Sequence, residues 1–406
     1  MAGGSIHAEP DWGSAVDFED VSGQVAIAGV GEADHSKASG RGVLEIAAQA
    51  VERALEDAGI EPEQVDGIMY SGGIGPQFDE TAYREHFGTQ GELWVSQQGG
   101  AMTWAATAPY RAARALQRGD ASVILNVFSV AWATDKRGGG AGPGRFHRDE
   151  QFKANLELPF GWYPQPVYFA TIARRHMHEY GTKAEDLGAI AVTCRRHALG
   201  HPGAVMAGKP LSLDDYLARP MLVDPLRMED CCLVSDGGAA YVMTAPERAR
   251  DLRKPVVTLV GVGEGRSGAG LYWSQQGDFT ATPQVFSAPP AFAMAGIGPD
   301  DVDVLTLYDP FTIVALMQIE DMGFCRKGEG GAFVAGDNLS FDTPGLAYNT
   351  HGGLLSHAYV LGIAHVVEVV RQLRGEAANQ VDGARVGVYG GYTGHLASTL
   401  VLRREP

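Results

Sequence analysis

An internal repeat is the feature of this sequence that most restricts its fold. Residues 58–66 read AGIEPEQVD, and residues 295–303 read AGIGPDDVD. In each copy a glycine ends a helix-like segment and a proline turn follows. An apolar strand-like run then begins, at 67–73 in the first copy and at 304–311 in the second. Two such blocks in matching contexts indicate a duplicated unit.

The repeat continues downstream of both blocks. A Gly-Gly pair at 99–100 precedes an Ala-rich helix-like segment and the apolar run 123–130. A second pair at 352–353 precedes another helix-like segment and the run 385–392. Continuously apolar strands that alternate with helices are typical of a parallel sheet covered on both faces. The sequence therefore predicts an α/β protein made of two βαβαβ-like halves.

The two halves are expected at 21–250 and 254–406. The stretch 131–220 interrupts the first half with a Gly-rich loop at 136–146 and with many aromatic and methionine side chains, so we interpret it as an insertion. Its apolar side chains have two alternative roles. They either pack within the protein or form a lid over an apolar acyl group, and the sequence leaves both roles open.

Composition and charge exclude several classes of protein. Hydrophobic residues make up 45% of the 406-residue chain and charged residues 20%, which suits a folded protein with large cores. The net charge of −17 argues against nucleic acid as a partner, because phosphate backbones attract an excess of Lys and Arg. No run approaches the roughly 20 apolar residues of a membrane span. The N-terminus does not resemble a signal peptide, so a cytoplasmic location is expected.

Cysteine usage points to a reduced protein. Four cysteines in so long a chain do not form a disulfide framework. They are Cys194, Cys231, Cys232 and Cys325. No CxxC pattern and no combined His and Cys cluster indicates zinc, so no metal site is expected.

Four segments resemble the thiolase superfamily. NTHGGLLSHAYVLG at 349–362 resembles the signature in which an Asn, a Gly-Gly pair and a Ser lead to a catalytic His-Pro. The segments 227–243, 322–331 and 388–394 resemble its lipid-transfer, sterol-carrier-type branch. The resemblance implies a thiolase fold, in which duplicated halves form a five-layer α-β-α-β-α sandwich. It also implies a homodimer and CoA thioester substrates.

The sequence departs from the thiolase pattern where thiolases carry their nucleophile. The family has a Cys at a helix N-terminus, where the helix dipole lowers the pKa of the thiol. The matching segment 96–106 reads SQQGGAMTWAA and contains no Cys, and Gly100 is the best equivalent position. Ser96 and Thr103 are the nearest hydroxyls, so an acyltransferase with a displaced nucleophile is one alternative. The second family Cys is replaced by Val388.

Two tyrosines occupy other site positions of the family. Tyr359 stands where thiolases have the catalytic His, and Tyr308 begins the segment YDPF where they have an Asn-Glu-type motif. Gly390 matches the glycine whose backbone N–H helps to form an oxyanion hole, which stabilises a thioester enolate. The resemblance therefore implies that an acid, a base and an oxyanion hole remain after the nucleophile is lost.

The loop before the second Gly-Gly pair supplies two further candidates, Asn349 and His351. His351 either orients Tyr359, holds a water in the site, or is an ordinary turn residue. His357 is expected to face outward and is not included in the candidate site. Residues that bind CoA or another cofactor are not identified by the sequence.

An acid, a base and an oxyanion hole suffice for retro-aldol cleavage beside a thioester. The pattern is similar to the thiolase-like aldolases of bacterial steroid side-chain degradation. That resemblance implies cleavage of a β-hydroxyacyl-CoA to a ketosteroid and a short acyl-CoA, with CoA entering only as part of the substrate. It also implies a separate OB-fold, acyl-CoA-associated partner protein.

The expected roles are base for Tyr359 and acid for Tyr308, or the reverse. Either role is expected to need neighbouring donors or cations that lower the tyrosine pKa from about 10. The alternative from another class is a non-catalytic acyl-CoA or lipid carrier that kept the fold. The identity of the acyl group is left open.

Overall fold

A computed structural model describes residues 10–71, 76–98, 102–135, 153–269 and 273–406 of the chain. Its strands are β1 (Gly13–Ala15), β2 (Ala26–Glu32), β3 (Gly67–Tyr70), β4 (Trp94–Ser96), β5 (Val123–Ala131), β6 (Met221–Val223), β7 (Leu226–Arg227), β8 (Asp236–Thr244), β9 (Val257–Ser267), β10 (Val304–Leu307), β11 (Ala347–Tyr348), β12 (Val386–Tyr392) and β13 (Leu396–Arg404). Its helices are α1 (Val43–Ala58), α2 (Glu80–Phe87), α3 (Trp104–Arg118), α4 (Gln165–Tyr180), α5 (Ala184–Gly200), α6 (Leu213–Ala218), α7 (Pro246–Arg250), α8 (Gln284–Ala295), α9 (Thr312–Asp321), α10 (Gly330–Val334), α11 (Gly353–Ser356) and α12 (Ile363–Arg374). None of the helices within these ranges combines the length and the apolar character that a membrane crossing requires.

The main strands form two groups with the same order and the same directions. The first group has the order β4-β3-β5-β8-β2, and the second has the order β11-β10-β12-β13-β9. In each group the first three strands are parallel, and each of the last two runs antiparallel to its neighbour. The shared topology supports the duplication that the repeat predicts. The exact boundaries 21–250 and 254–406 stay a prediction.

The expectation of a fully parallel sheet is wrong for two strands of each group. β12 and β13 are joined by a short turn after Tyr392, and a connection of that length permits only antiparallel pairing. β5 and β8 are also antiparallel, although every residue of both is buried. A continuous apolar run reports burial on both faces of a strand and carries no information about its direction.

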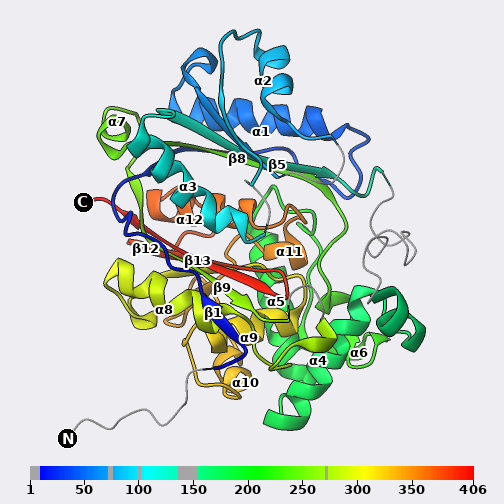
Figure 1. The fold of residues 1–406 in the computed structure, drawn as a ribbon. Coiled ribbons are helices and arrows are strands. Elements are labelled where there is room, and N and C mark those ends of the chain that lie inside the picture. Colours follow the sequence, from blue (N-terminus) through cyan, green and yellow to red (C-terminus); the bar gives the residue numbers. More distant parts are fainter. Residues whose placement is uncertain (1–9, 72–75, 99–101, 136–152, 270–272) are drawn as a thin grey trace, which may run out of the picture.

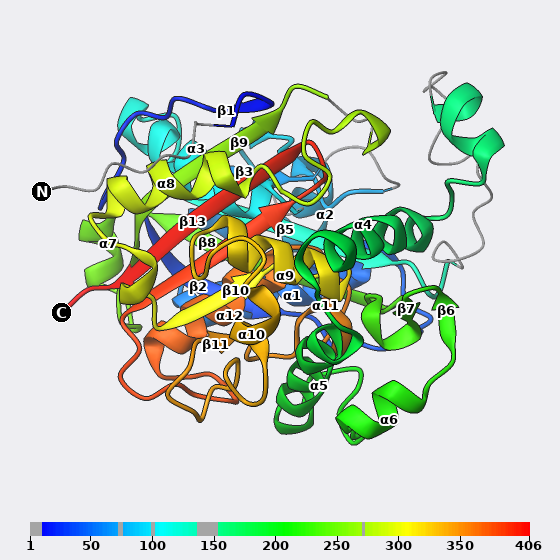
Figure 2. The ribbon, with the colours of Figure 1, turned by 90° about the horizontal axis from the view of Figure 1, so that it is seen from below.

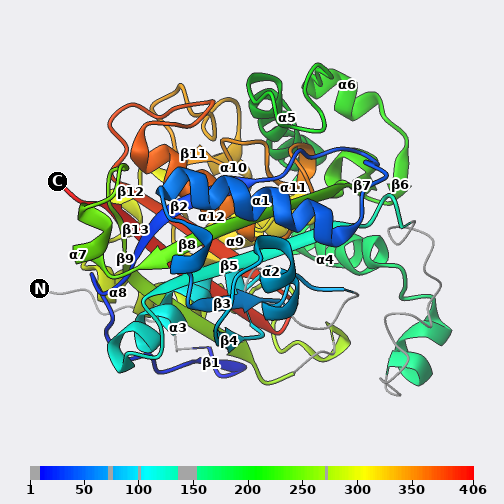
Figure 3. The same cartoon turned by 90° about the horizontal axis from the view of Figure 1, so that it is seen from above.

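Helices and strand groups alternate in five layers (Figure 1). α1 and α2 cover the outer face of the first group, as the view from above also shows (Figure 3). α3 and α12 lie between the two groups, and α8, α9 and α10 cover the outer face of the second. β2 and β9 pair at Ala26–Thr258 and Ile27–Val257, which joins the groups into one folded sheet. The predicted five-layer sandwich is therefore present.

The repeated blocks end matching helices. α1 ends at Gly59 with φ 67°, and α8 ends at Gly296 with φ 66°. This left-handed backbone is accessible to glycine at little cost, so both helices stop where the sequence predicts. A single turn of 3-10 helix follows each glycine, at Pro62–Gln64 and at Pro299–Asp301, and leads into β3 or β10.

The inserted stretch is largely helical where the structure describes it. α4, α5, α6 and the β6–β7 hairpin gather at one edge of the molecule (Figure 2). α5 packs against α9, α10 and α11, and Phe169 of α4 stacks on Phe311 with ring centroids 4.1 Å apart. These contacts agree with the packing role of its aromatic side chains. The Gly-rich loop 136–146 lies outside the described residues, and the lid role stays a prediction.

Candidate active site

The hydroxyl oxygens of Tyr308 and Tyr359 lie 3.2 Å apart, within hydrogen-bond distance. Tyr308 directly follows β10, and Tyr359 lies in the segment between α11 and α12. Both residues are buried, with exposed fractions of 4% and 8%. Carboxyl ends of parallel strands are the usual place of functional groups in α/β proteins. The structure thus brings together the two tyrosines that the sequence singles out, and we call them the tyrosine pair.

Burial raises the pKa of both tyrosines. The pKa of Tyr308 lies well above its usual value, and the neighbouring hydroxyl of Tyr359 contributes to the rise. The pKa of Tyr359 rises even though its hydrogen bond with Tyr308 acts in the opposite direction. The expectation that donors or cations lower these values is therefore wrong. Both hydroxyls are protonated at neutral pH, and each can donate one proton while it accepts another.

Residues of the first half support Tyr359. The indole ring of Trp132 packs against the Tyr359 ring with centroids 4.8 Å apart. The backbone N–H of Tyr359 donates a hydrogen bond of 2.8 Å to Ser235 Oγ. The sequence interpretation missed both residues. A signal existed for Trp132, because it directly follows the buried strand β5 at the strand's carboxyl end.

Gly390 lies beside Tyr308 in the sheet, where its carbonyl oxygen accepts a 2.8 Å hydrogen bond from the Tyr308 N–H. A Cβ at Gly390 would come within 2.6 Å of a leucine side chain of β10, so packing alone already requires glycine here. A Cβ at Gly391 would lie 2.8 Å from the Met102 carbonyl oxygen, so β12 passes close to the start of α3. The position predicted for the lost nucleophile, Gly100, lies outside the described residues.

The side chain of Asn349 is hydrogen-bonded to the backbone of the residue before Tyr308. Its side-chain Oδ1 accepts a hydrogen bond of 2.9 Å from the Leu307 N–H, and its Nδ2 donates one of 3.1 Å to the Leu307 carbonyl. The residue is fully buried and has a φ of 41°, a region where asparagine is tolerated better than most residues. Asn349 therefore fixes the end of β10, from which Tyr308 extends.

His351 is buried among other histidines. Its ring packs between those of His357 and His365, with centroid distances of 5.0 and 4.7 Å. Neither of its ring nitrogens has a hydrogen-bond partner among the described residues. These contacts do not include Tyr359, so an orienting role for His351 stays a prediction. The expectation that His357 faces outward is wrong, because only 1% of its surface is exposed. α11 is a single turn, too short for helical periodicity to give a direction.

None of the cysteines is placed as a thiolate nucleophile. Burial raises the pKa of Cys231 and of Cys325 to about 12, and it also raises the pKa of Cys194 and of Cys232 above the usual value. A thiol of this kind is protonated and weakly reactive at neutral pH. Within the described ranges, no hydrogen bond joins Ser96 or Thr103 to a histidine that would activate it.

Comparisons with known proteins identify the family of this chain. Residues 265–404 match the family described as Thiolase C-terminal domain-like. The chain is 36% identical to the steroid side-chain-cleaving aldolase of Thermomonospora curvata, over 94% of this chain and 98% of that protein. It is 35% identical to the 17-hydroxy-3-oxo-4-pregnene-20-carboxyl-CoA lyase of Mycobacterium tuberculosis, over 94% of this chain and all of that protein. The solved structure of the Ltp2-ChsH2(DUF35) aldolase matches with a TM-score of 0.85 and 35% identity, and covers 95% of this chain and 99% of that one.

The layered fold and these matches define a class of protein, the thiolase-like superfamily, with its α/β fold and mixed sheet. Within that superfamily the chain belongs to the family of carbon–carbon-cleaving aldolases that contains the two relatives named above. The predictions of fold, family and enzyme class are therefore confirmed. The catalytic roles of Tyr308 and Tyr359 stay a prediction.

Proposed function

We propose that this chain cleaves the Cα–Cβ bond of a β-hydroxyacyl-CoA thioester, releasing a ketone and a short acyl-CoA. The names of the two relatives support a steroid side-chain CoA ester as the substrate, with CoA present only as part of that substrate. The observation that carries the proposal is the buried hydrogen bond between Tyr308 and Tyr359. It supplies proton transfer at a site that lacks an activated thiol.

The proposed reaction moves one proton from oxygen to carbon. Tyr359 accepts the proton of the β-hydroxyl, the Cα–Cβ bond breaks, and the former hydroxyl becomes the ketone. Tyr308 delivers a proton to Cα of the resulting enolate. The two roles are interchangeable, since the two hydroxyls hydrogen-bond each other. Their raised pKa values favour a concerted transfer along the 3.2 Å contact, because neither tyrosine then has to exist as a free tyrosinate.

An oxyanion hole is the second part of the mechanism. The backbone N–H of Gly390 contributes to it and stabilises the enolate oxygen of the thioester. Two facts support this assignment: Gly390 adjoins Tyr308 in the sheet, and β12 passes close to the start of α3 at Gly391. Asn349 holds the end of β10 in register. His351, two residues beyond Asn349, is a further candidate for the site.

The proposal extends to partners and location. The name of the matching solved structure joins Ltp2 with ChsH2(DUF35), which supports a separate OB-fold, acyl-CoA-associated partner for this chain. A homodimer is expected from the thiolase fold, with each chain carrying its own tyrosine pair. A cytoplasmic location completes the proposal.

The test is a product assay by mass spectrometry with a β-hydroxy steroid side-chain acyl-CoA, with and without a co-expressed OB-fold partner. The wild type should release a ketosteroid and a short acyl-CoA. Tyr359→Phe should lose at least about 100-fold in rate, the usual scale of general acid–base catalysis. Tyr83→Phe is the matched control, because Tyr83 is buried in α2 and its hydroxyl donates to the Pro62 carbonyl far from the site. Tight binding of the ester without cleavage by the wild type would instead identify a carrier.

A further inference from the structure

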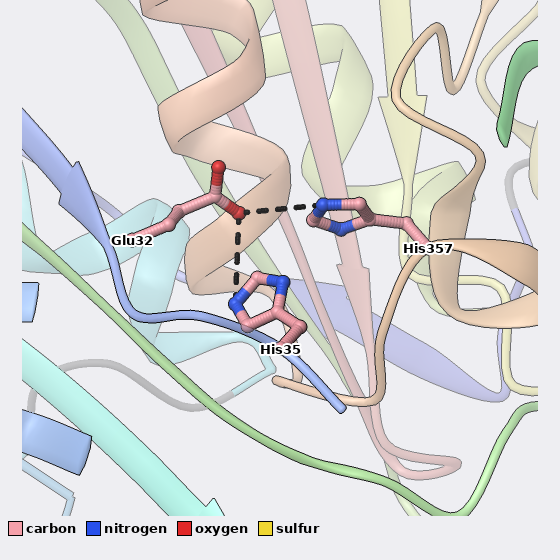
Figure 4. A group of neighbouring side chains, drawn as sticks. All are labelled: Glu32, His35 and His357. Atoms are coloured by element: carbon pink, nitrogen blue, oxygen red, sulfur yellow. Dashed lines mark ion pairs between the residues drawn. The ribbon is translucent and has the colours of Figure 1, made fainter. Parts of the chain in front are cut away.

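Three side chains that the proposed reaction does not use converge at a second place, where the first half meets the segment before Tyr359. Glu32 ends β2, His35 follows it by three residues, and His357 follows α11. Figure 4 shows one carboxylate oxygen of Glu32 facing both imidazole rings. Glu32 Oε1 lies 3.9 Å from His35 Nε2 and 3.8 Å from His357 Nε2. We call Glu32, His35 and His357 the Glu–His cluster.

The Glu–His cluster is buried and its polar atoms are poorly satisfied. The side chains of Glu32, His35 and His357 are 10%, 2% and 1% exposed. Glu32 Oε1 and both ring nitrogens of His357 have no hydrogen-bond partner among the described residues. Buried polar atoms without partners are rare because they lose their hydration and gain nothing in return. Glu32 Oε1 and His357 Nε2 face each other without a hydrogen bond, which indicates a ligand between them.

The spacing suits a metal ion better than direct hydrogen bonds. Distances of 3.8 and 3.9 Å are too long for hydrogen bonds between the side chains. One ligand atom from each residue lies within 4.8 Å of the other two. Ligands that bind a tetrahedral zinc ion at about 2.0–2.2 Å lie about 3.4 Å from one another. The two Glu32–His pairs therefore need to close by about half an ångström to hold such an ion, and the His35–His357 pair, which lies within 4.8 Å, by at most about 1.4 Å.

Neighbouring groups prepare the cluster for this role. Arg371 forms an ion pair with the other oxygen of Glu32, which orients the carboxylate and leaves Oε1 facing the imidazoles. His35 Nε2 lies 3.3 Å from the Gly238 carbonyl, a long contact that a bond to the ion replaces.

The donor set also indicates which kind of ion fits. Two of the three ligands are imidazole, which suits zinc and related transition metals rather than Ca²⁺ or Mg²⁺. The charge of Glu32 is already compensated by Arg371, which further disfavours ions held mainly by negative charge. A fourth ligand comes from water or from His201, whose ring centroid is 4.7 Å from that of His357.

We propose that Glu32, His35 and His357 bind one divalent transition-metal ion of the zinc class. The ion joins the first half of the fold to the segment that carries Tyr359. Tyr359 lies two residues beyond His357 in that segment. The sequence gives no clear sign of this site, because His357 lies 322 positions beyond His35 and none of the three residues is a cysteine. The inference does not depend on the aldolase proposal.

The test uses the full-length chain without a histidine tag, loaded with Zn²⁺, dialysed and analysed for metal content. The wild type should retain one zinc per chain, and its Co²⁺ form should show visible absorption bands typical of a tetrahedral site. His35→Gln and His357→Gln should each lose the metal. His86→Gln is the matched control and should keep it, because His86 is an exposed histidine that pairs with Glu52 at 2.8 Å.

A second measurement needs no variant. Adding Zn²⁺ to the chelator-treated wild type should raise its Tm by about 3 °C, because an ion that binds only the folded state stabilises it. Glu32→Gln, which keeps an oxygen acceptor but removes the charge, should reduce this rise. A wild type that retains no zinc and shows no change in Tm would overturn the proposal. Equal zinc content in wild type and His357→Gln would also overturn it.

Discussion

The oxygen and the nitrogen of the Asn349 side-chain amide are both hydrogen-bonded to the backbone of Leu307, the residue that precedes Tyr308. The carboxyl end of β10 is thus held by a side chain from another loop. The position of the Tyr308 hydroxyl depends on this end, so the geometry of the tyrosine pair is set partly by a residue that does not contact it.

Replacing Asn349 with Ala should cost about 2 kcal/mol of unfolding free energy or more, because two buried backbone groups lose their partners. The same change should lower kcat more than it raises KM, since Tyr308 loses its anchor. Denaturant unfolding and steady-state kinetics measure the two effects. Asn338→Ala is the control, because Asn338 is exposed and donates only to the Phe333 carbonyl. Equal stability of the two variants would contradict the role given to Asn349.

Asp236 fixes the segment that carries Trp132. Its carboxylate accepts hydrogen bonds from the backbone N–H groups of Ala133, Thr134 and Ser39 and from the hydroxyls of Thr134 and Ser39. Asp236→Ala should therefore destabilise the fold by about 3 kcal/mol, since several half-buried donors lose their acceptor.

The Asp236→Ala variant should also bind substrate but turn it over slowly, because Trp132 no longer holds the ring of Tyr359. Thermal unfolding and single-turnover rates test both effects. If the Asp236→Ala protein is less stable but turns over substrate at the wild-type rate, Asp236 does not act on the site through Trp132.

Trp132 itself gives a sharper test of ring packing. Trp132→Ala should slow cleavage about fivefold, because an aromatic pair contributes about 1 kcal/mol beyond its buried area. Trp132→Phe should recover most of the rate, since it preserves a ring against Tyr359. If Phe and Ala at this position reduce the rate to the same extent, the packing explanation fails.

His197 should make stability sensitive to acid. It lies between the Asn349 carbonyl at 3.2 Å and the Phe341 N–H at 3.4 Å, and burial lowers its pKa from 6.5 to about 4. Above pH 6.5 this residue has no pH effect, because it is neutral in both states. As the pH falls from 6.5 toward 4, the unfolded chain takes up a proton that the folded chain refuses, and about 3 kcal/mol of stability is lost.

The measurement is denaturant unfolding of the wild type and of His197→Gln at pH 7 and at pH 4. The wild type should lose more stability than the variant over this interval, because Gln does not titrate. An identical loss in both proteins would show that other buried groups account for the acid sensitivity.

The sequence predicted the duplication and the tyrosine pair for identifiable reasons. The two glycines at 59 and 296 end their helices in left-handed conformations, a local requirement that the sequence displays directly. Tyr308 and Tyr359 were found because they replace residues of a recognisable pattern. Their contact agrees with that interpretation, although they are 51 positions apart in the sequence.

Other features depend on three-dimensional contacts that no local pattern encodes. The rise in tyrosine pKa comes from burial, and burial of Tyr359 depends on Trp132 from the other half. The inward direction of His357 is set by its neighbours Glu32 and His351 rather than by a helix period. β8 runs antiparallel to β5 because the two strands pair in that direction, although the whole insertion separates them in the sequence.

The most direct test of the central claim is a double-mutant cycle of Tyr308→Phe and Tyr359→Phe, measured as single-turnover cleavage of a β-hydroxyacyl-CoA ester. Each single change should slow cleavage at least about 100-fold, and the double variant should be hardly slower than either one, because the two hydroxyls act as one proton-transfer unit. Near-normal cleavage by either single variant, or losses that multiply in the double variant, would refute the role proposed for the tyrosine pair.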